Sequence, residues 1–122
     1  MNLMVWDGSE KRRFVRANFP CKIIIYTPQE QVISAQTENI SAGGVRVIID
    51  KELKVSLSVD LELYFTENPV KCKGRVVWML SKENLESVEI KKYDVGIEFY
   101  RIASADRSLI SKFIETLVSK EK

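Results

Sequence analysis

Apolar and polar residues alternate along most of the chain between residues 21 and 99. A period of two is typical of strands that bury one face and expose the other. The six segments that carry this pattern, or are rich in β-branched residues, are Cys21–Tyr26, Gln31–Glu38, Val45–Ile49, Val59–Phe65, Val70–Trp78 and Tyr93–Phe99. The short turns between them predict antiparallel pairing, with one face of each strand filling the interior.

The segments between these strands differ in character. Thr27–Glu30 and Thr66–Pro69 each contain a proline and predict tight turns. Lys51–Ser58 is a connection whose apolar residues allow part of it to pack. Ser81–Lys92 holds three Glu and three Lys, so it predicts a solvated loop between two strands.

After Ala103 the apolar period changes from that of a strand to that of a helix. From Leu109 to Val118, apolar residues recur at i, i+1, i+4, i+5, i+8 and i+9, which gives the helix one apolar side. Ser104 is the expected N-cap, and Asp106 in the first turn is favourable for the helix dipole. Such a helix can cover an open end or face of the sheet. We predict a mainly β fold, a six-stranded antiparallel β-barrel with a C-terminal α-helix, with a β-sandwich as the alternative.

A length of 122 residues suits one domain with one core. We place that domain at residues 10–119, preceded by residues 1–9 as an N-terminal segment that can fold back or stay loose. No apolar run is long enough to span a membrane. Met1–Asp7 lacks the basic and long apolar regions of a secretory signal, so a cytoplasmic location is the default prediction.

Four single residues inside the predicted strands bear on chemistry and shape. Cys21 and Cys72 have no partner at a metal-site spacing, so we predict two buried thiols rather than a disulfide or a zinc site. Gly74 and Gly96 weaken a sheet, and each therefore indicates a bulge, a bend or the close approach of another group.

Most of the chemistry that catalysis requires is missing from the sequence. There is no histidine, which is the commonest general base and metal ligand. No Gly-rich phosphate loop precedes a helix, and the carboxylates are scattered among lysines. We therefore predict a protein that is not an enzyme and that uses no metal and no cofactor. The net charge of +2 does not predict DNA or RNA as a partner.

Positive charge is concentrated just before the first strand. Residues 10–16 carry four positive charges, from Lys11, Arg12, Arg13 and Arg16, and one negative charge, from Glu10. An arginine can donate two hydrogen bonds to guanine O6 and N7 or to a phosphate, and it can stack on a base. A short anionic ligand is one interpretation of this segment, and a solvated basic tail is the other.

A second motif lies at the predicted corner Asn39–Gly44, between two strands. Asn and Ser can bond their own backbone and Gly allows positive φ, so a self-bonded turn is one interpretation. The other is a binding site. The amide of Asn39, the hydroxyl of Ser41 and the bare backbone at Gly43 and Gly44 would suit the edge and face of a flat ring.

The two motifs together are more specific than either alone. Arg12-x-x-x-Arg16 followed by Asn39-x-Ser41-x-x-Gly44 resembles the signature of the PilZ domain family. Members of that family are small bacterial receptors for the second messenger cyclic di-GMP. The family fold is a six-stranded antiparallel barrel with a C-terminal helix, which agrees with the pattern above.

The resemblance covers residues 10–117, and Gly74–Trp78 and Tyr93–Phe99 are similar to the later strands of the family. It implies that cyclic di-GMP is the ligand. The resemblance assigns a role in binding this ligand to Arg12, Arg13, Arg16, Asn39, Ser41, Gly43, Gly44 and Trp78. In the family the arginines hold guanines and phosphates, and the second motif contacts a guanine. A tryptophan lines the site in some members; for Trp78 a place in the core is the alternative.

The function that the resemblance implies is a receptor that changes conformation on binding cyclic di-GMP and signals to an unidentified output protein. Control of motility, biofilm formation or secretion would be the outcome. A PilZ-like adaptor that binds no nucleotide and acts by direct protein contact is the alternative. A single-stranded nucleic-acid binder would need exposed aromatics along a basic face, whereas most aromatics here fall on inward strand positions.

Overall fold

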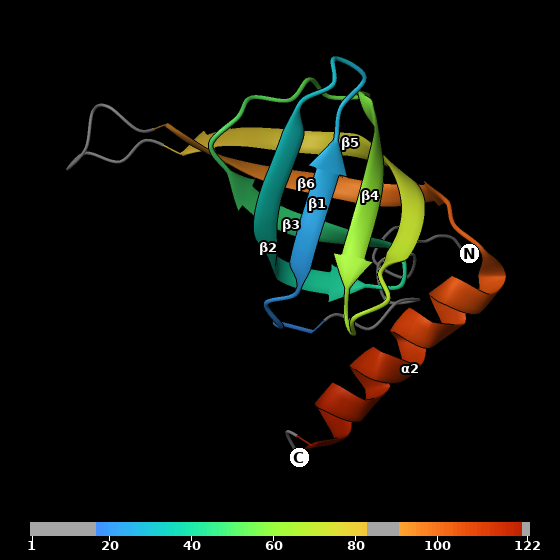
Figure 1. Cartoon of the computed structure of the whole chain (residues 1–122). Helices are drawn as coiled ribbons and strands as arrows, with labels where there is room; N and C mark the ends of the chain where they lie inside the picture. The colour runs from blue at the N-terminus through green and yellow to red at the C-terminus, as the bar shows by residue number, and fades with distance from the viewer. Residues whose placement is uncertain (1–16, 83–90, 121–122) are drawn as a thin grey trace, which may run out of the picture.

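Six antiparallel strands close into a barrel in the order β1-β2-β3-β6-β5-β4 (Figure 1). The computed structural model describes residues 17–82 and 91–120, with side chains as far as residue 117. The elements are β1 (Lys22–Tyr26), β2 (Val32–Ser41), β3 (Gly44–Ile49), β4 (Ser58–Tyr64), β5 (Val70–Lys82), β6 (Lys92–Arg101) and α2 (Ser104–Lys120). The predicted barrel with a C-terminal helix is therefore confirmed, and the β-sandwich is not the fold.

The inward side chains of all six strands form one apolar core. The members that are almost completely buried include Ile23, Ile25, Ile40, Val47, Leu61, Leu63, Val76, Val95 and Ile97. Because every second residue of a strand faces the same side, closing the sheet turns these alternating positions into a continuous interior. The period of two thus supplies the apolar interior, and the pairing of β1 with β4 closes the sheet around it.

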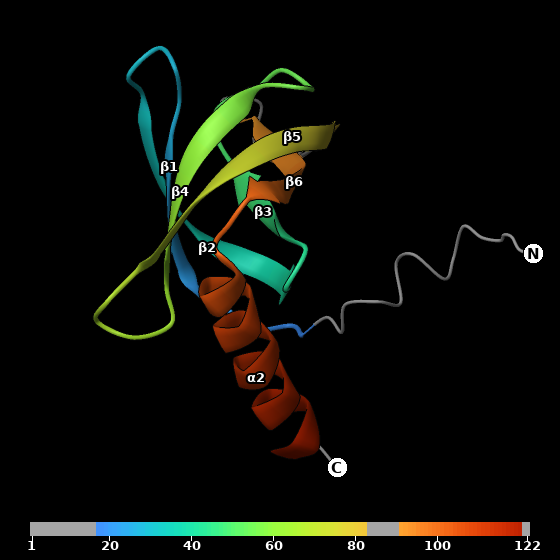
Figure 2. The same cartoon turned by 90° about the vertical axis from the view of Figure 1, so that its right-hand side faces the viewer.

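Helix α2 covers the end of the barrel where β1 begins and β4 ends (Figures 1 and 2). Its Phe113 ring lies 5.2 Å from the ring of Phe19 and 4.9 Å from that of Phe65, measured between centroids. Ile110 and Ile114 on the same side of the helix are buried. Edge-to-face aromatic packing and apolar burial therefore hold the helix against the open end.

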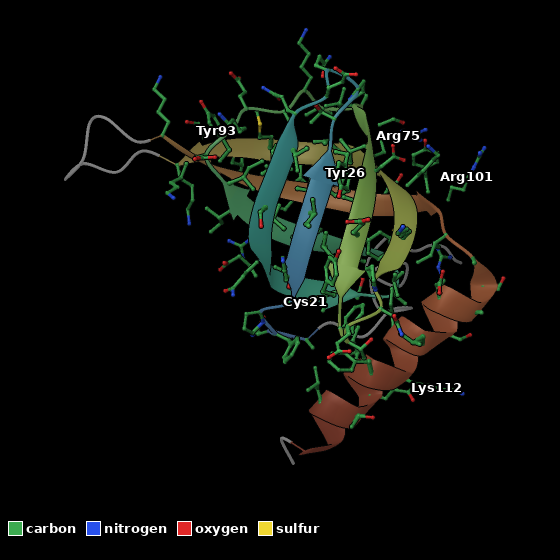
Figure 3. The ribbon with its side chains drawn as sticks, in the orientation of Figure 1. Cys21, Tyr26, Arg75, Tyr93, Arg101 and Lys112 are labelled. Carbon is green, nitrogen blue, oxygen red and sulfur yellow. The ribbon has the colours of Figure 1, made fainter. Side chains whose placement is uncertain are left out.

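The apolar side of α2 is narrower than the sequence pattern predicts. Leu109 is 48% exposed, because the buried stripe runs through Ile110, Phe113 and Ile114 and leaves Leu109 at its edge. Lys112 points away from the barrel (Figure 3), as expected for the polar side. The side chain of Val118 lies outside the described residues.

β-Bulges change which side chains face outward on two strands. Thr37 pairs with Val47 and Asn39 pairs with Arg46, so Glu38 is an extra residue in β2. A bulge of this kind shifts the alternation by one position. Regular alternation after Ile33, Ala35 and Thr37 would point Asn39 inward. The extra residue turns Asn39 to the outer face.

A second bulge changes the outward side chains of β5. Val76 pairs with Ile97 and Trp78 pairs with Gly96, which leaves Val77 as the extra residue. Strict alternation would have placed Trp78 on the inner face with Val76, and the bulge turns it to the outer face. Gly74 also lies at a register shift, and a Cβ there would meet Leu61 and Ile97 in the core at 2.8 and 2.6 Å. The predicted bulge and close approach at this glycine are both confirmed.

The predicted corner Asn39–Gly44 is shorter than expected. Strand β2 continues to Ser41 and β3 begins at Gly44, so only Ala42 and Gly43 form the turn. No glycine in the described part of the chain has positive φ. Neither Gly43 nor Gly44 therefore uses the positive φ that glycine allows, and the reason for Gly44 lies in the packing of the neighbouring strand.

Strands β5 and β6 are longer than predicted. β5 runs to Lys82 and β6 starts at Lys92, since Ser81 pairs with Tyr93 and Lys82 with Lys92. The loop expected at Ser81–Lys92 is therefore shorter, because Ser81 and Lys82 belong to β5 and Lys92 belongs to β6. Its central residues 83–90 lie outside the described residues.

The two cysteines are buried free thiols, as predicted. Burial raises the pKa of Cys21 to about 11 and that of Cys72 to about 12. Both thiols are therefore protonated at neutral pH, which makes them poor nucleophiles and poor metal ligands.

Thr37 connects the segment before β1 to the middle of β2. Its buried Oγ1 accepts a hydrogen bond from Cys21 N at 3.0 Å and donates one to Phe19 O at 2.8 Å. Thr37 N also donates to Cys21 O at 2.9 Å. This threonine therefore fixes the path by which the chain enters the barrel.

Replacement of Thr37 by valine is expected to lower the free energy of unfolding by about 2 kcal/mol. Valine keeps the shape but leaves Cys21 N and Phe19 O without their side-chain partner. Urea unfolding followed by tryptophan fluorescence measures the change. The matched control is Thr116→Val, which removes an exposed hydroxyl bonded to Lys112 O. Equal losses in both variants would contradict the role given to Thr37.

Candidate functional site

One row of outward-facing residues crosses four strands of the barrel. Asn39 on β2 pairs with Arg46 on β3, Arg46 pairs with Gly96 on β6, and Gly96 pairs with Trp78 on β5. The two bulges described above put the first and last members of this row on the outer face. Residues from three distant parts of the sequence are thereby brought side by side.

A surface hollow of about 640 Å³ lies over this row. Its lining contains all five predicted site residues that the structure describes, namely Asn39, Ser41, Gly43, Gly44 and Trp78. The lining also includes Val45, Arg46, Val77, Gly96, Ile97 and Glu98. The volume is in the range of small-molecule sites in proteins. We call this feature the outer hollow.

The hydroxyl of Ser41 is used within the turn between β2 and β3. Ser41 Oγ accepts a hydrogen bond from Gly43 N at 3.0 Å and donates one to Gly44 O at 3.4 Å. The residue is only 2% exposed. Ser41 therefore holds the backbone of the two glycines in place at the edge of the outer hollow, as the self-bonded interpretation predicts.

Gly44 allows β3 and β6 to lie in close contact at the edge of the hollow. A Cβ at this position would overlap Ile97 O and lie 3.0 Å from Glu98 Cα, which are backbone atoms of the neighbouring strand. Phe99 N also donates a hydrogen bond to Gly43 O at 2.9 Å. Only a residue without a side chain fits here, and the result is a flat stretch of bare backbone.

Trp78 lies on the surface, with 38% of its area exposed. Its indole rests against Gly96, because a Cβ on Gly96 would overlap the indole ring. The close approach predicted from a glycine inside a strand is confirmed here, and the approaching group is Trp78. The alternative of a core position for Trp78 is wrong, since the bulge at Val77 turns the side chain outward.

Three further polar or small residues, which belong to neither sequence motif, line the outer hollow. They are Arg46, Gly96 and Glu98. Alternation alone places Arg46 and Glu98 on outward faces. Their meeting in one hollow depends on the pairing of β3 with β6, which joins segments that lie far apart in sequence.

Arg46 is held rigidly beside the hollow. Its Nε and Nη2 donate to the two carboxylate oxygens of Asp94, each at 2.8 Å. The bond to this carboxylate raises the pKa of the Arg46 guanidinium above its ordinary value. Asp94 is 7% exposed, whereas the Arg46 side chain keeps 36% of its area exposed. The two-point contact fixes the plane of a cation that still faces solvent.

The predicted arginines Arg12, Arg13 and Arg16 lie outside the described residues. The described chain begins at Ala17, which forms a two-bond bridge with Ile40: Ala17 N donates to Ile40 O at 2.9 Å, and Ile40 N to Ala17 O at 3.0 Å. Ile40 lies between Asn39 and Ser41. The point at which the arginine segment joins the barrel is therefore next to the second motif.

A second hollow of about 430 Å³ lies on a different part of the surface, formed partly by β1, β4 and β5. Figure 3 shows Tyr26 on the face of β1 and β4 that is turned to the viewer. Tyr26 Oη donates to Glu62 at 2.8 Å, Lys71 lies 3.8 Å from Glu62, and Lys73 lies 2.9 Å from Asp60. Four of its charged residues are thus paired with one another, and it contains none of the predicted site residues that the structure describes, so the outer hollow is the better candidate site.

Two negative findings apply to the residues that the structure describes. Over 17–82 and 91–120, no group of three or more His, Cys, Asp or Glu side chains could hold a metal ion. No helix in the same ranges is long and apolar enough to cross a membrane.

Comparison with solved structures finds the same fold in several proteins. The inhibitor of motility of Bacillus subtilis, MotI/DgrA, superposes with a TM-score of 0.74 at 21% identity, over 91% of this chain and 53% of that one. The PilZ domain of YcgR from Escherichia coli gives 0.70 at 11% identity, over 91% and 94% of the two chains. MrkH of K. pneumonia in its apo state gives 0.75 at 15% identity, over 88% and 50%.

The chain thus spans about half the length of the MotI and MrkH chains, and nearly all of the YcgR domain. At these identities the likeness concerns the fold. No curated protein sequence matches the chain. The sequence model of the PilZ domain matches residues 10–116. Since that match takes in both motifs, all six strands and most of α2, the chain belongs to the PilZ domain family.

Proposed function

We propose that this protein is a cyclic di-GMP receptor that binds its ligand in the outer hollow and passes the signal to a partner protein. The observation that supports the proposal is that the second motif lines the outer hollow and that Ala17, the first described residue after the arginine motif, is bonded beside it. Asn39, Ser41 and Gly44 line the hollow, and the bridge at Ala17 brings the chain that follows Arg16 to the same edge. The PilZ domain of YcgR, which has the same fold, was solved with c-di-GMP.

The residues of the site have separate roles in this proposal. Arg16 directly precedes Ala17 in the sequence, and Arg12 lies four residues before Arg16. In this proposal both arginines act at the hollow, where they would hold phosphates and guanine O6 and N7. Arg13 adds a contact of the same kind.

The barrel supplies the remaining contacts. Asn39 offers an amide, and the turn fixed by Ser41 presents the backbone of Gly43 and Gly44 to a flat ring. The exposed indole of Trp78 offers a face on which a base can stack. Closing the arginine segment over the ligand would create or hide the surface that the partner protein reads.

A protein partner is favoured over a nucleic acid in the proposal. The net charge is +2, and two lysines of the β4–β5 face are already paired with carboxylates. MrkH is described as a c-di-GMP dependence transcription regulatory factor, so a DNA-binding assay with and without ligand is a useful control. DNA binding that rises on addition of cyclic di-GMP would contradict this part of the proposal.

Calorimetric titration of the native chain with cyclic di-GMP tests the proposal. We expect saturable heat, a stoichiometry of one or two ligands per chain, and stabilisation of the fold by about 2.7 kcal/mol at a ligand concentration of 100 Kd. Cyclic di-AMP is the matched control, because adenine lacks the O6 acceptor that an arginine reads. No heat and no change in Tm at high cyclic di-GMP would overturn the proposal.

The same family offers a second candidate, an adaptor that binds no nucleotide. The observation in its favour is that the Ser41 hydroxyl is already satisfied within its own turn. This candidate predicts that a partner protein, once isolated, binds equally well to native protein and to a variant without Arg12 and Arg16. Absence of heat in the titration above would select it.

A further inference from the structure

Four residues on the outer face of β3 and β6 form a square block at the floor of the outer hollow. Gly44 pairs with Glu98 and Arg46 pairs with Gly96. The two glycines therefore occupy one diagonal of the block and the two charged residues occupy the other. The glycine diagonal leaves a patch of sheet without side chains, and the charged diagonal borders it on both sides.

Arg46 has two carboxylates of β6 within reach and bonds to only one of them. Since Arg46 pairs with Gly96, Asp94 and Glu98 are its diagonal neighbours on either side. Both short bonds from Arg46, at 2.8 Å each, go to Asp94. Glu98 is left without this cation.

The other arginine beside Glu98 is also engaged elsewhere. Arg75 on β5 pairs directly with Glu98 in the sheet. Its guanidinium instead lies over the ring of Tyr100, at 4.5 Å from the centroid. Across the described parts of the chain, the side chain of Glu98 forms no hydrogen bond and no ion pair, although two arginines flank it in the sheet.

An unpaired carboxylate is unfavourable in a site for an anion unless the ligand also brings hydrogen-bond donors. An ionised Glu can only accept hydrogen bonds, and it would repel a phosphate placed against it. Guanine carries two adjacent donors on its Watson–Crick edge, N1–H and the exocyclic N2–H₂. A carboxylate with two oxygens is the side chain that matches this pair of donors.

The surroundings of Glu98 suit a flat ring in this position. Gly44 and Gly96 allow a base to lie close to the sheet, and the Trp78 indole forms a wall beside Gly96. Gly96 and Glu98 face the same side of β6, about 7 Å apart along the strand. A base that rests against Trp78 over the glycines therefore has its edge near the Glu98 carboxylate.

We propose that Glu98 determines specificity for guanine by accepting hydrogen bonds from N1–H and N2–H₂ of one base of the ligand. This inference rests on the proposed function and names the atoms by which that site selects its ligand. Adenine presents an acceptor at N1 and has no exocyclic group at C2. The same carboxylate would therefore repel an adenine in the same pose.

A cycle of two ligands and two proteins tests the inference. The ligands are cyclic di-GMP and cyclic di-IMP, in which hypoxanthine keeps N1–H and O6 but lacks the 2-amino group. The proteins are the native chain and Glu98→Gln, with Glu115→Gln on the exposed side of α2 as the control for loss of one negative charge. Affinities are measured by calorimetry at one salt concentration.

In the native protein we expect cyclic di-GMP to bind about tenfold more tightly than cyclic di-IMP, because a hydrogen bond to a charged group is lost. In Glu98→Gln the ratio should fall to less than about threefold, and in Glu115→Gln it should stay at the native value. An exposed position makes Glu98→Gln safe for folding, which thermal unfolding checks.

Two other results would overturn the inference in distinguishable ways. If Glu98 holds the arginines of residues 12–16 instead of the base, Glu98→Gln will change the affinity for both ligands by the same factor and leave their ratio unchanged. In that case the proposed function stands and only the role of Glu98 fails. If neither ligand binds to the native chain, the proposed function and the inference fail together.

Discussion

Replacement of Arg16 by alanine is expected to weaken cyclic di-GMP binding by at least about a hundredfold, because each charge-assisted hydrogen bond contributes about 1.5–3 kcal/mol. Arg16 directly precedes Ala17, which is bonded to Ile40 at the edge of the outer hollow. Of the three arginines in residues 12–16, Arg16 is the nearest in sequence to the described barrel. Calorimetric titration of the variant against the native chain gives the loss directly.

The matched control for this prediction is Arg101→Ala. Arg101 is an exposed arginine at the end of β6 and lines the second hollow instead of the outer one (Figure 3). Its removal changes the net charge by the same amount and should alter the affinity by less than about threefold. If both variants lose affinity for cyclic di-GMP equally, the ligand is attracted by the net positive charge and makes no specific contact with Arg16.

Replacement of Gly44 by alanine is expected to lower the free energy of unfolding by about 3 kcal/mol and Tm by roughly 10 °C. The added Cβ would overlap Ile97 O and press on Glu98 Cα, and both are backbone atoms of β6. Backbone in a closed ladder cannot rotate away as a side chain can, so β3 and β6 must separate locally. Thermal and urea unfolding of the variant measure the cost.

Gly96→Ala is the control that separates this backbone conflict from a conflict with a side chain. Its Cβ would meet the Trp78 indole, which can swing away from the sheet. We expect a stability loss of less than about 1 kcal/mol and a loss of affinity for cyclic di-GMP of about tenfold, since the stacking surface moves. A larger stability loss for Gly96→Ala than for Gly44→Ala would contradict this account of the two glycines.

The barrel was largely predictable because its cause is local. One face of each strand is apolar, and alternation at Val59–Phe65 and Tyr93–Phe99 identifies that face without knowledge of any partner strand. The helix was predictable for the same reason, although the edge position of Leu109 depends on how Phe113 meets Phe19 and Phe65.

The outward position of Trp78 could not be predicted from alternation. A bulge is a property of two strands together, and nothing in the composition of β5 marks Val77 as the extra residue. The glycine inside β6 was the available signal, since a strand glycine predicts a close neighbour. It did not identify that neighbour as Trp78.

The part of the second motif that lines the outer hollow could be found from the sequence, but the charged residues beside it could not be assigned to the hollow. Asn39, Ser41 and Gly44 form a recognisable spacing in the sequence. Arg46 and Glu98 have ordinary surface positions in two strands, and their meeting follows from the pairing of β3 with β6. The competition between Asp94 and Glu98 for Arg46 is decided by side-chain geometry that the sequence does not contain.

The bulges at Glu38 and Val77 have a consequence for how genes of this family can change in length. Loss of one codon at either point would restore regular alternation and leave all other inward and outward side chains on their present faces. Loss of a codon elsewhere in β2 or β5 would shift part of the strand by one position and exchange core residues for surface residues. Insertions and deletions between relatives should therefore collect at bulges such as these two, which lie on either side of the outer hollow and preserve its geometry.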